Sequence, residues 1–315
     1  MADRMLLVGE PMGLFIAQEE GPLDGVSGYT FAVAGAEYNV AVGMTRLGHA
    51  VDYITKLGSD PFGKRIAHSM AQNGICTTGL VWDKEHPTGF MLKSKVRQGD
   101  PEIFYFRKNS AASTLSVAEV DAIDLQGYSN LHMTGILPAL SEHCLAASRR
   151  LLERARAAGL FVSFDPNLRP ALWESREKMI AALNELAARC NLVLPGIAEG
   201  ELLTGSRVPT EIAKRYHQMG VDTVVVKLGA QGAYASDGKQ ELTVAGFPVS
   251  HVVDTVGAGD GFAVGVVSAL VEGLPLSQAL RRGNAIGAIQ VMSIGDNEGL
   301  PTPAELENFM KRGTR

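Results

Sequence analysis

Short apolar runs alternate with segments of helical periodicity along most of the chain. The runs are rich in Val, Ile and Leu, and their nearly continuous apolar character is typical of parallel strands that helices cover on both faces. The alternation therefore predicts βαβ units on a parallel sheet. The predicted strands are Met5–Val8, His49–Thr55, Leu160–Phe164, Leu192–Leu194 and Thr223–Lys227.

Helices are predicted between these strands, where apolar residues recur on one face. The predicted helices are Glu37–Leu47, a segment from Pro61 to Gly74, Ser141–Ala158, Gly261–Val271 and Leu276–Gln290. Asp60 is a suitable N-cap residue, and Pro61, which follows it, fits the first helical position. The segment Gly261–Val271 is apolar almost all round, which predicts a helix buried in the interior.

Two regions depart from this alternation and predict a small accessory sheet. Gly89–Arg107 carries two strand-like runs around the turn residues Arg97 to Pro101, the pattern of a β-hairpin. Pro11–Ala34 is also β-like and contains no convincing helix. Because no Pro/Gly/Ser linker divides the chain, we expect one domain over residues 1–315, with insertions at about 11–34 and 87–110.

Composition narrows the classes of protein to consider. The 315 residues are 46% hydrophobic and 20% charged, which is ample for a buried core and unlike a disordered chain. A net charge of −5 argues against a nucleic-acid partner. The apolar stretch Phe262 to Val271 is too short to span a bilayer. Three widely spaced cysteines favour neither a disulfide framework nor a zinc site, so we expect a reduced, cytoplasmic protein.

The most informative motif runs from Asp254 to Gly261, with the sequence DTVGAGDG, between a β-like run Phe247–Val253 and the predicted buried helix. Backbone N–H groups of consecutive small residues can converge on an anion, and a helix N-terminus adds about half a positive charge. Asp260 repels a phosphate but is well placed to accept a hydroxyl proton. An anion site beside a base is what phosphoryl transfer to an alcohol requires. The structural alternative is a glycine-rich turn with an acidic helix cap.

Three further sets of residues are candidates for ligand contacts. Gly35 permits close approach to the backbone, and Asn39, one turn into a helix, can donate and accept toward sugar hydroxyls. Asp165, Asn167 and Arg169 alternate at the carboxyl end of a strand, where ligands of open α/β sheets bind. Tyr105 and Arg107 share one face of the second hairpin strand. Each set also has a purely structural interpretation, as a helix start, a capped loop and a solvated strand face.

Two other patterns argue against a P-loop nucleotide site and against an oxidoreductase. Gly58, Gly63 and Lys64 imitate the spacing of a P-loop, but Arg65 stands where Ser or Thr would bind magnesium, so this segment is predicted to be a structural turn. No GxGxxG follows the first strand, which argues against a dinucleotide-dependent oxidoreductase.

The motifs, in this order over nearly the whole chain, resemble the ribokinase-like (PfkB) family of carbohydrate kinases. The resemblance is carried by Gly35–Asn39, Leu47–Gly48 with Lys56–Gly63, and Asp254–Asp260. It implies a ribokinase-like three-layer α/β/α sandwich with a small β-sheet lid. It further implies that Asp260 is the catalytic base and that Gly257, Ala258 and Gly259 form the anion hole for the transferred phosphate.

The same resemblance implies cofactor sites. Lys227, Gly229, Gly232 and Asn284 match positions around ATP, together with Gly257 and Gly259. Glu199 matches a glutamate that positions a Mg²⁺-bound water, although Gly196 replaces the asparagine that usually stands three residues before it. A monovalent cation, K⁺, near Asp254 and a homo-oligomer formed through the lid are left open.

Within the family, the strings Tyr105–Ser113, Leu194–Glu199 and Asp165–Arg169 resemble kinases of 2-keto-3-deoxygluconate. The implied reaction phosphorylates the terminal hydroxyl to give the 6-phosphate. The implied substrate residues are Gly35, Asn39, Phe90, Tyr105, Arg107, Arg169 and Asp260. Arg107 and Arg169 are predicted to bind the carboxylate of this acid as planar forks.

Two alternatives stay open at this point. Fructokinases share Asp165–Arg169 but usually carry Gly-Ala-Asp near Ser110–Ser113, so a fructokinase or another sugar kinase of the family is the first alternative. A non-catalytic sugar-binding protein on the same fold is the second. Because a protein that only binds sugar could lose its base at no cost, the presence of Asp260 beside an intact glycine turn favours catalysis.

Overall fold

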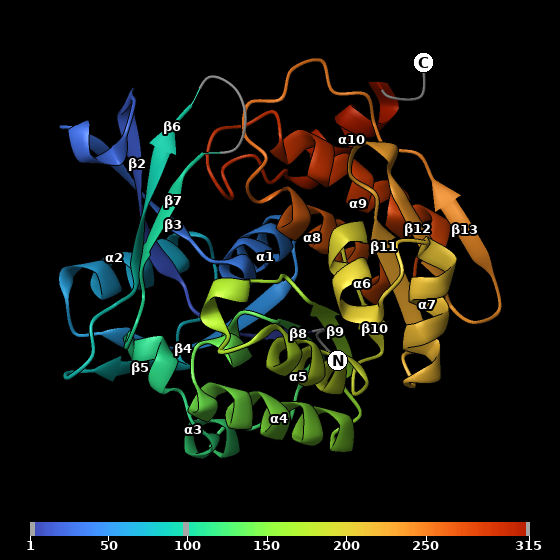
Figure 1. The fold of residues 1–315 in the computed structure, drawn as a ribbon, viewed down its shortest axis with the longest axis horizontal. Coiled ribbons are helices and arrows are strands. Elements are labelled where there is room, and N and C mark those ends of the chain that lie inside the picture. The colour runs from blue at the N-terminus through green and yellow to red at the C-terminus, as the bar shows by residue number, and fades with distance from the viewer. Residues whose placement is uncertain (1–3, 97–100, 313–315) are drawn as a thin grey trace.

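The computed structural model describes residues 4–96 and 101–312, and its strands form two sheets (Figure 1). In the described residues the larger sheet has nine strands, which are, from one edge to the other, β13 (Glu241–Val244), β12 (Ala233–Ser236), β11 (Thr223–Lys227), β10 (Leu192–Val193), β9 (Phe161–Asp165), β8 (Tyr128–Thr134), β1 (Arg4–Val8), β4 (Ala50–Gly58) and β5 (Leu80–Asp83). The strands from β11 to β5 are parallel, whereas β12 and β13 pair antiparallel at the edge.

Helices cover both faces of this sheet, as the continuous apolar strands predicted. One face packs against α1 (Ala36–Arg46), α2 (Pro61–Gln72), α8 (Ala258–Val271), α9 (Leu276–Gln290) and α10 (Pro303–Arg312). The other packs against α3 (Val117–Asp121), α4 (Glu142–Ala157), α5 (Arg176–Ala187), α6 (Ile197–Thr204) and α7 (Pro209–Gln218). Each face therefore has its own hydrophobic core, and the predicted three-layer α/β/α sandwich is confirmed.

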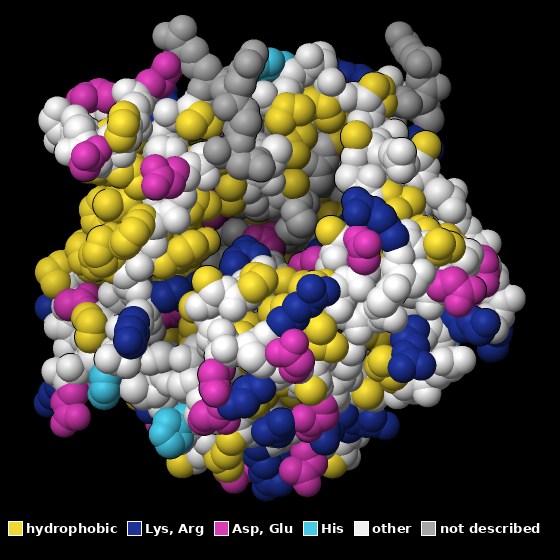
Figure 2. All heavy atoms as spheres, in the orientation of Figure 1, with side chains coloured by type: hydrophobic (Ala, Val, Ile, Leu, Met, Phe, Trp, Pro, Cys, Tyr) yellow, Lys and Arg dark blue, Asp and Glu magenta, His cyan; other side chains and the backbone are white. Residues whose placement is uncertain are grey.

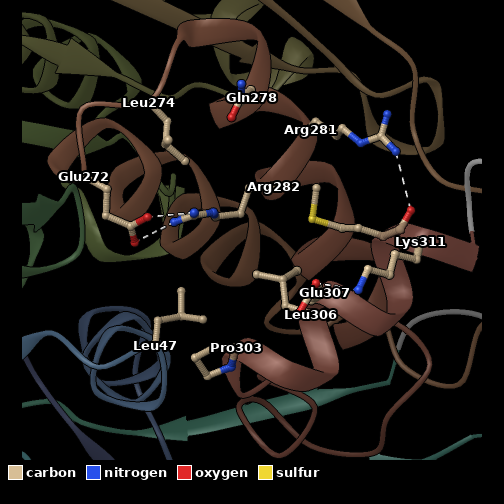
Figure 3. A pocket seen from close by; sticks show the side chains of 11 residues that line it. Leu47, Glu272, Leu274, Gln278, Arg281, Arg282, Pro303, Leu306, Glu307 and Lys311 are labelled. Atoms are coloured by element: carbon tan, nitrogen blue, oxygen red, sulfur yellow. Dashed lines mark hydrogen bonds and ion pairs between the residues drawn. The ribbon is translucent and has the colours of Figure 1, made fainter.

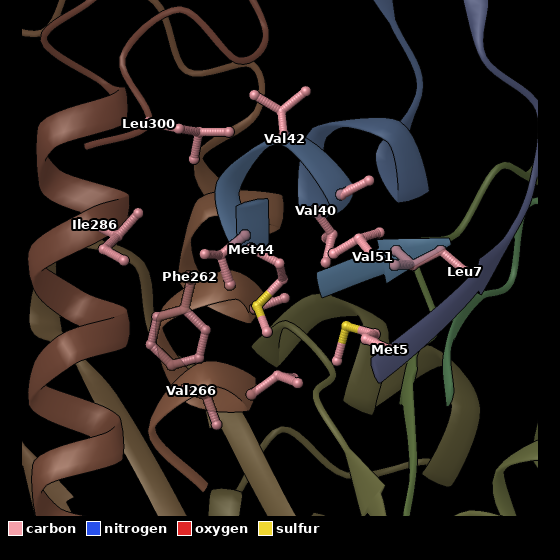
Figure 4. Packing of buried hydrophobic residues seen from close by; sticks show 14 of the residues in the cluster. Met5, Leu7, Val40, Val42, Met44, Val51, Phe262, Val266, Ile286 and Leu300 are labelled. Carbon is pink, nitrogen blue, oxygen red and sulfur yellow. The ribbon is translucent and has the colours of Figure 1, made fainter. Parts of the chain in front are cut away.

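Helix α8 lies in the middle of the first core, in agreement with its apolar sequence. Its residues from Asp260 to Ala269 are buried, and Figure 4 shows Phe262 between Ile286 of α9 and Met44 of α1. The α8 and α9 backbones approach so closely that a Cβ on Gly265 would lie 2.6 Å from the Cα of Gly283.

The prediction of a strand over Phe247–Val253 is wrong. These residues form a loop, because β13 ends at Val244 and the chain then crosses to the start of α8. Phe247 packs on Phe309 of α10, with ring centroids 5.3 Å apart, and Val253 is exposed. The apolar residues of this run therefore contact a helix or solvent rather than a neighbouring strand.

The predicted accessory sheet is confirmed. It consists of β3 (Tyr29–Ala34), β2 (Met12–Glu20), β6 (Phe90–Lys95) and β7 (Ile103–Phe106), in that order, and is called the lid below. Strands β6 and β7 form the predicted antiparallel hairpin. Most of its turn, residues 97–100, lies outside the described residues. In Figure 1 the lid strands stand at the left, beside the main body.

The P-loop-like segment is a structural turn, as predicted. Asp60 is the N-cap of α2, where Oδ1 accepts a hydrogen bond from Gly63 N at 2.8 Å. Its other oxygen accepts from Thr88 N at 2.7 Å and so connects the turn to the segment before β6.

The three cysteines are free, and no helix of the described chain has the length and hydropathy to span a membrane.

Candidate active site

A cavity of about 550 Å³ lies where the carboxyl ends of the parallel strands face the lid. Figure 2 shows a hollow in this region, with acidic and basic side chains at its floor. The cavity brings together eleven residues that the sequence selected, namely Gly35, Asn39, Tyr105, Arg107, Asn167, Arg169, Glu199, Lys227, Gly257, Gly259 and Asp260. Its position agrees with the rule that ligands of open α/β sheets bind beyond the carboxyl ends of the strands.

Six selected residues do not line this cavity. One of them, Asp165, is instead bound to Lys227. Phe90 lies on the other face of β6, stacked on Phe106 with ring centroids 4.6 Å apart, so the structure gives it no place on a substrate. Gly232 and Asn284 support the segment after β13 instead. A Cβ on Gly232 would lie 2.0 Å from Val244 O, and Asn284 Nδ2 donates to the same carbonyl at 3.0 Å. The remaining two residues are Gly229, in the turn after β11, and Ala258, the first residue of α8.

A second hollow, of about 700 Å³, lies between α9, α10 and the end of α1 (Figure 3). Its charged side chains are engaged with one another, since Arg282 of α9 contacts Glu272 at 2.7 Å. None of the candidate catalytic or ligand-binding residues lines it. The smaller cavity at the strand ends is therefore the candidate active site.

The carboxyl group of Asp260 lies in the first turn of α8 and is bound by two amides. Asn39 Nδ2 donates to Oδ2 at 2.7 Å, and Asn167 Nδ2 lies 3.3 Å from Oδ1. Burial raises the pKa of Asp260 to about 7, and Asp165 adds to the rise, while Asn39, Arg169 and Lys227 oppose it. A carboxyl group with this pKa exchanges a proton near neutral pH, which suits a general base.

Asn39 lines the cavity, and its side-chain amide also contacts two residues of the protein. Its Nδ2 is bound to Asp260, and its Oδ1 accepts a hydrogen bond from Asn297 Nδ2 at 2.9 Å. Asn297 Nδ2 in turn also donates to Val33 O at 2.9 Å, at the end of lid strand β3. Asn39 therefore orients the candidate base, and Asn297 fixes Asn39. Nothing in the local sequence pointed to Asn297, because its partner is far away along the chain.

The glycine turn presents the N-terminus of α8 to the cavity. Gly257 is the N-cap residue at φ +78°, and a Cβ there would lie 2.1 Å from Asp296 O. Only glycine fits both the left-handed backbone and the close approach. Because Gly257 and Gly259 line the cavity, the helix N-terminus provides a site for an anion next to Asp260.

Lys227, at the end of β11, forms a buried ion pair beside the turn. Its Nζ lies 2.9 and 2.7 Å from the two oxygens of Asp165, and 4.0 Å from Glu199 Oε2. Burial opposes the charge on Lys227, but these two carboxylates outweigh burial and raise the pKa of the amine. A permanently charged amine on the cavity wall is suited to phosphate oxygens.

Glu199 joins the ends of two neighbouring strands. Its Oε2 accepts from Gly196 N at 2.6 Å at the start of α6, and its Oε1 accepts from Leu168 N at 2.9 Å. Gly196 is the N-cap residue of α6, with an ordinary extended backbone. Each Glu199 oxygen keeps a second lone pair, so the carboxylate can still accept from a water in the cavity.

The two arginines of the cavity have different surroundings. Arg107 is buried, with Nε 2.7 Å from Glu10 Oε2, and Ser110 Oγ donates to the other oxygen of Glu10. Arg169 donates to Leu168 O at 2.9 Å and forms an ion pair with no carboxylate in the described parts of the chain. Sequence reasoning missed Glu10, although a carboxylate directly after the first strand was a usable signal.

Residues 4–96 and 101–312 contain no group of three or more His, Cys, Asp or Glu arranged to hold a metal ion. Glu199 lines the cavity and keeps lone pairs free, and unlike Asp260 and Asp296 it lies beyond the ends of β9 and β10, between Gly196 and Leu168. It is therefore the residue of the site that fits a hydrated Mg²⁺ brought in with a nucleotide.

Comparison with known proteins agrees with this geometry. The family model described as pfkB family carbohydrate kinase matches residues 2–303. The chain belongs to the pfkB family. This carbohydrate kinase is 46% identical over 303 residues to the 2-dehydro-3-deoxygluconokinase of Bacillus subtilis, covering 96% of this chain and 94% of the relative. It is 32% identical to the 2-dehydro-3-deoxygluconokinase of Thermoproteus tenax (98% and 94% covered) and 32% identical to fructokinase-2 of Solanum lycopersicum (91% and 89% covered).

Solved structures share the whole fold of the kinase. A putative ribokinase II of E. coli in complex with ATP and Mg²⁺ matches with a TM-score of 0.89 and 27% identity, covering 98% of this chain and 99% of that one. A Vibrio cholerae fructokinase double mutant with bound fructose, ADP and potassium ion matches with a TM-score of 0.87 and 25% identity, with 98% of each chain covered. The ribokinase-like fold is thereby confirmed.

The hydrogen bond from Asn39 predicts a change in the pH dependence of the kinase. Below a pH of about 7 the protonated Asp260 cannot accept a proton, so kcat/KM should fall on the acid side. Asn39→Ala removes a bond that favours the carboxylate and should move this acid limb upward by about one to two pH units, given that a hydrogen bond to a charged group contributes about 1.5–3 kcal/mol.

Asn297→Ala is the matched control, because it leaves the bond between Asn39 and Asp260 in place. Its acid limb should move less than that of Asn39→Ala in the same pH series. Coincident acid limbs in Asn39→Ala and the wild type would show that Asn39 does not set the charge state of the base.

Proposed function

We propose that this kinase transfers the γ-phosphate of ATP to the terminal hydroxyl of 2-dehydro-3-deoxygluconate, the same compound as 2-keto-3-deoxygluconate, to give its 6-phosphate. Residues 1–315 act as one kinase domain with the lid over the site. The observation that carries the choice of an acid is Arg169, a cation on the cavity wall with no carboxylate partner among the described residues. The name of the Bacillus relative supports the same substrate.

Asp260 is the general base of the proposed reaction. Its carboxylate takes the proton of the terminal hydroxyl while the hydroxyl oxygen forms a bond to the γ-phosphorus. The bond between the γ-phosphorus and the bridging oxygen breaks, ADP leaves, and the proton stays on Asp260 until solvent removes it. Asn39 and Asn167 hold the carboxylate in place, as their distances of 2.7 and 3.3 Å indicate.

The phosphate groups of ATP are assigned to the turn Gly257–Gly259 and to Lys227. The helix N-terminus meets negative charge on the transferred group, and the ammonium adds a compact positive charge. Gly232 and Asn284 act on the nucleotide indirectly, by supporting the segment after β13, and Gly229 is proposed to lie near it in the turn after β11. An ATP-dependent reaction and three free cysteines are consistent with the cytoplasm.

Mg²⁺ is the proposed metal, since the E. coli neighbour was solved with ATP and Mg²⁺. Bound to the nucleotide, it neutralises charge on the phosphate oxygens. Glu199 would reach its water shell, and the bonds from Gly196 N and Leu168 N keep that carboxylate in place.

The sugar acid is proposed to contact the arginines through its carboxylate. Arg169 supplies a charge that no direct ion pair among the described residues offsets, whereas Arg107 is paired with Glu10 and would mainly orient the carboxylate. Tyr105 and the backbone at Gly35 complete the wall, with the Arg107 guanidinium 5.6 Å from the centroid of the Tyr105 ring. Such a site favours a carboxylate over a neutral sugar, because a neutral sugar would leave Arg169 unpaired.

A substrate panel tests the proposed function. ATP consumption should be highest with 2-dehydro-3-deoxygluconate and much lower with fructose, ribose or adenosine. Asp260→Asn should lower kcat by about 10²–10⁴-fold while leaving ligand binding, because the amide has the same shape but cannot accept the proton. Faster turnover of fructose would establish the fructokinase alternative, and a kcat near the wild-type value in Asp260→Asn would remove Asp260 from the role of base.

The contrast between the arginines gives a second prediction. Arg169→Ala should raise KM for the sugar acid by about 10- to 100-fold, the equivalent of about 1.5–3 kcal/mol for a charged hydrogen bond, and leave KM for ATP and for fructose nearly unchanged. Arg107→Ala should instead lower the thermal stability, because it leaves Glu10 buried without its partner, at a cost of up to about 3–5 kcal/mol. Unchanged selectivity between acid and neutral sugar in Arg169→Ala would rule out the proposed carboxylate contact.

We also propose that two copies associate through the lid. Phe104 and Phe106 on edge strand β7 are 55% and 45% exposed, and Figure 2 shows hydrophobic side chains gathered over this part of the molecule. An edge strand with exposed aromatic side chains is typical of a surface that another protein covers.

Phe104→Asp should convert a dimer into a monomer in sedimentation velocity. Val208→Asp is the matched control, since Val208 is 52% exposed just before α7, away from the lid. A monomeric wild type, or an equal loss of dimer in both variants, would count against the lid interface.

A further inference from the structure

Lys93 of lid strand β6 is a buried cation that sequence reasoning did not select. Lys93 is only 3% exposed, although its strand belongs to the lid. The ammonium lies 2.6 Å from Asp254 Oδ2 and 3.2 Å from Asp296 Oδ1. One lysine therefore joins two acidic residues of the main body, and both of those side chains are nine-tenths buried or more.

Both acidic residues support the glycine turn of the candidate anion site. Asp254 opens the motif, and its Oδ1 accepts from Val256 N at 3.1 Å, one residue before Gly257. Asp296 packs on the turn through its backbone, since its carbonyl oxygen would lie 2.1 Å from a Cβ on Gly257. A displacement of either residue would thus displace the N–H groups at the start of α8.

Two carboxylates this close together and this buried need a compensating positive charge. Burial raises the pKa of Asp296, and Asp254 adds to the rise, while Lys93 opposes it. With Lys93 present, the cluster has a cation in contact with both carboxylates, at direct ion-pair distances.

The resemblance to carbohydrate kinases left a monovalent cation near Asp254 open, and the Vibrio fructokinase neighbour was solved with a potassium ion. The residues of this chain do not fit such an ion. Asp254 Oδ2 is 2.6 Å from the Lys93 ammonium, which also contacts Asp296, and Asp254 Oδ1 accepts from Val256 N. A second cation there would meet the repulsion of the first.

We propose that Lys93 is a positioning residue that supplies, from the lid and as part of the chain, the positive charge that holds Asp254 and Asp296 against the glycine turn, so that the kinase needs no monovalent metal ion. The proposal rests on the proposed kinase activity but not on the identity of the sugar. Its tests use whichever sugar the substrate panel shows to be turned over best, so a wrong sugar assignment and a failure of this proposal give different results.

The first test needs no variant. Turnover of the wild type is measured with ATP and Mg²⁺ in salts of K⁺, Na⁺, NH₄⁺ and the bulky N-methylglucamine cation at constant ionic strength. We expect the same kcat in all four salts. A kcat that requires K⁺ or NH₄⁺ would overturn the proposal.

The second test removes the ammonium. Lys93→Ala should lower kcat by about 10²-fold, the size of effect that follows a small misplacement of catalytic groups, with little change in KM for the sugar. K⁺ or NH₄⁺ should restore part of this kcat, because each can enter the space that the side chain leaves. Lys93→Met should lose as much activity without being restored, since its chain fills the space.

Lys95→Ala is the matched control, because Lys95 lies on the same strand but is exposed, and its activity should equal that of the wild type. A wild-type kcat in Lys93→Ala, or a loss that is the same in every salt while the near-ultraviolet circular dichroism stays native, would overturn the proposal.

A crystallographic readout is independent of activity and of the folding of the variants. Crystals of the wild type soaked in rubidium chloride should show no anomalous peak between Asp254 and Asp296. A rubidium ion bound to Asp254 in the wild type would overturn the proposal, whereas a peak that is present only in Lys93→Ala would support it.

Discussion

The burial of the Asp260 carboxyl group at the N-terminus of α8 is the constraint on which the rest of the site depends. A buried carboxylate is costly unless it is hydrogen-bonded and its charge is balanced. The two asparagine amides and the nearby Arg169 and Lys227 lower that cost, while Asp165 and the apolar helix raise the pKa again. The balance raises the pKa of Asp260 to about 7, which suits the proposed role of this residue as a base beside the candidate anion site.

The lid is connected to this site by charge as well as by its backbone. Strand β6 brings Lys93 to Asp254 and Asp296, and the residue that follows strand β7, Arg107, meets Glu10 after strand β1. In each contact, a positively charged side chain in or next to the lid pairs with a buried carboxylate outside it. These carboxylates belong to the main body or to the segment between β1 and β2. Movements of the lid must therefore either keep these ion pairs or expose their carboxylates to water, which couples the position of the lid to the geometry of the site.

The parts predicted from the sequence were those that local patterns determine. The apolar runs correctly predicted the parallel strands, and the turn residues correctly predicted the lid hairpin. The apolar sequence of α8 correctly predicted that this helix is buried. The strand predicted over Phe247–Val253 was wrong because an apolar run can also pack on a helix, as Phe247 does on Phe309. Asn297, Glu10 and Lys93 were missed because their partners become neighbours only after folding. Asn39 and Asn297, for example, are 258 positions apart.

The charge state of Asp260 is the most direct test of this account. Isotope-edited NMR of the aspartate carboxyl carbons, assigned with Asp260→Asn, would follow its titration in the free enzyme. We expect the Asp260 signal to titrate with a midpoint at about 7, well above the ordinary range. An Asp260 signal that titrates near the ordinary value for an exposed aspartate, about 4, would contradict the claim that burial prepares this residue as the base.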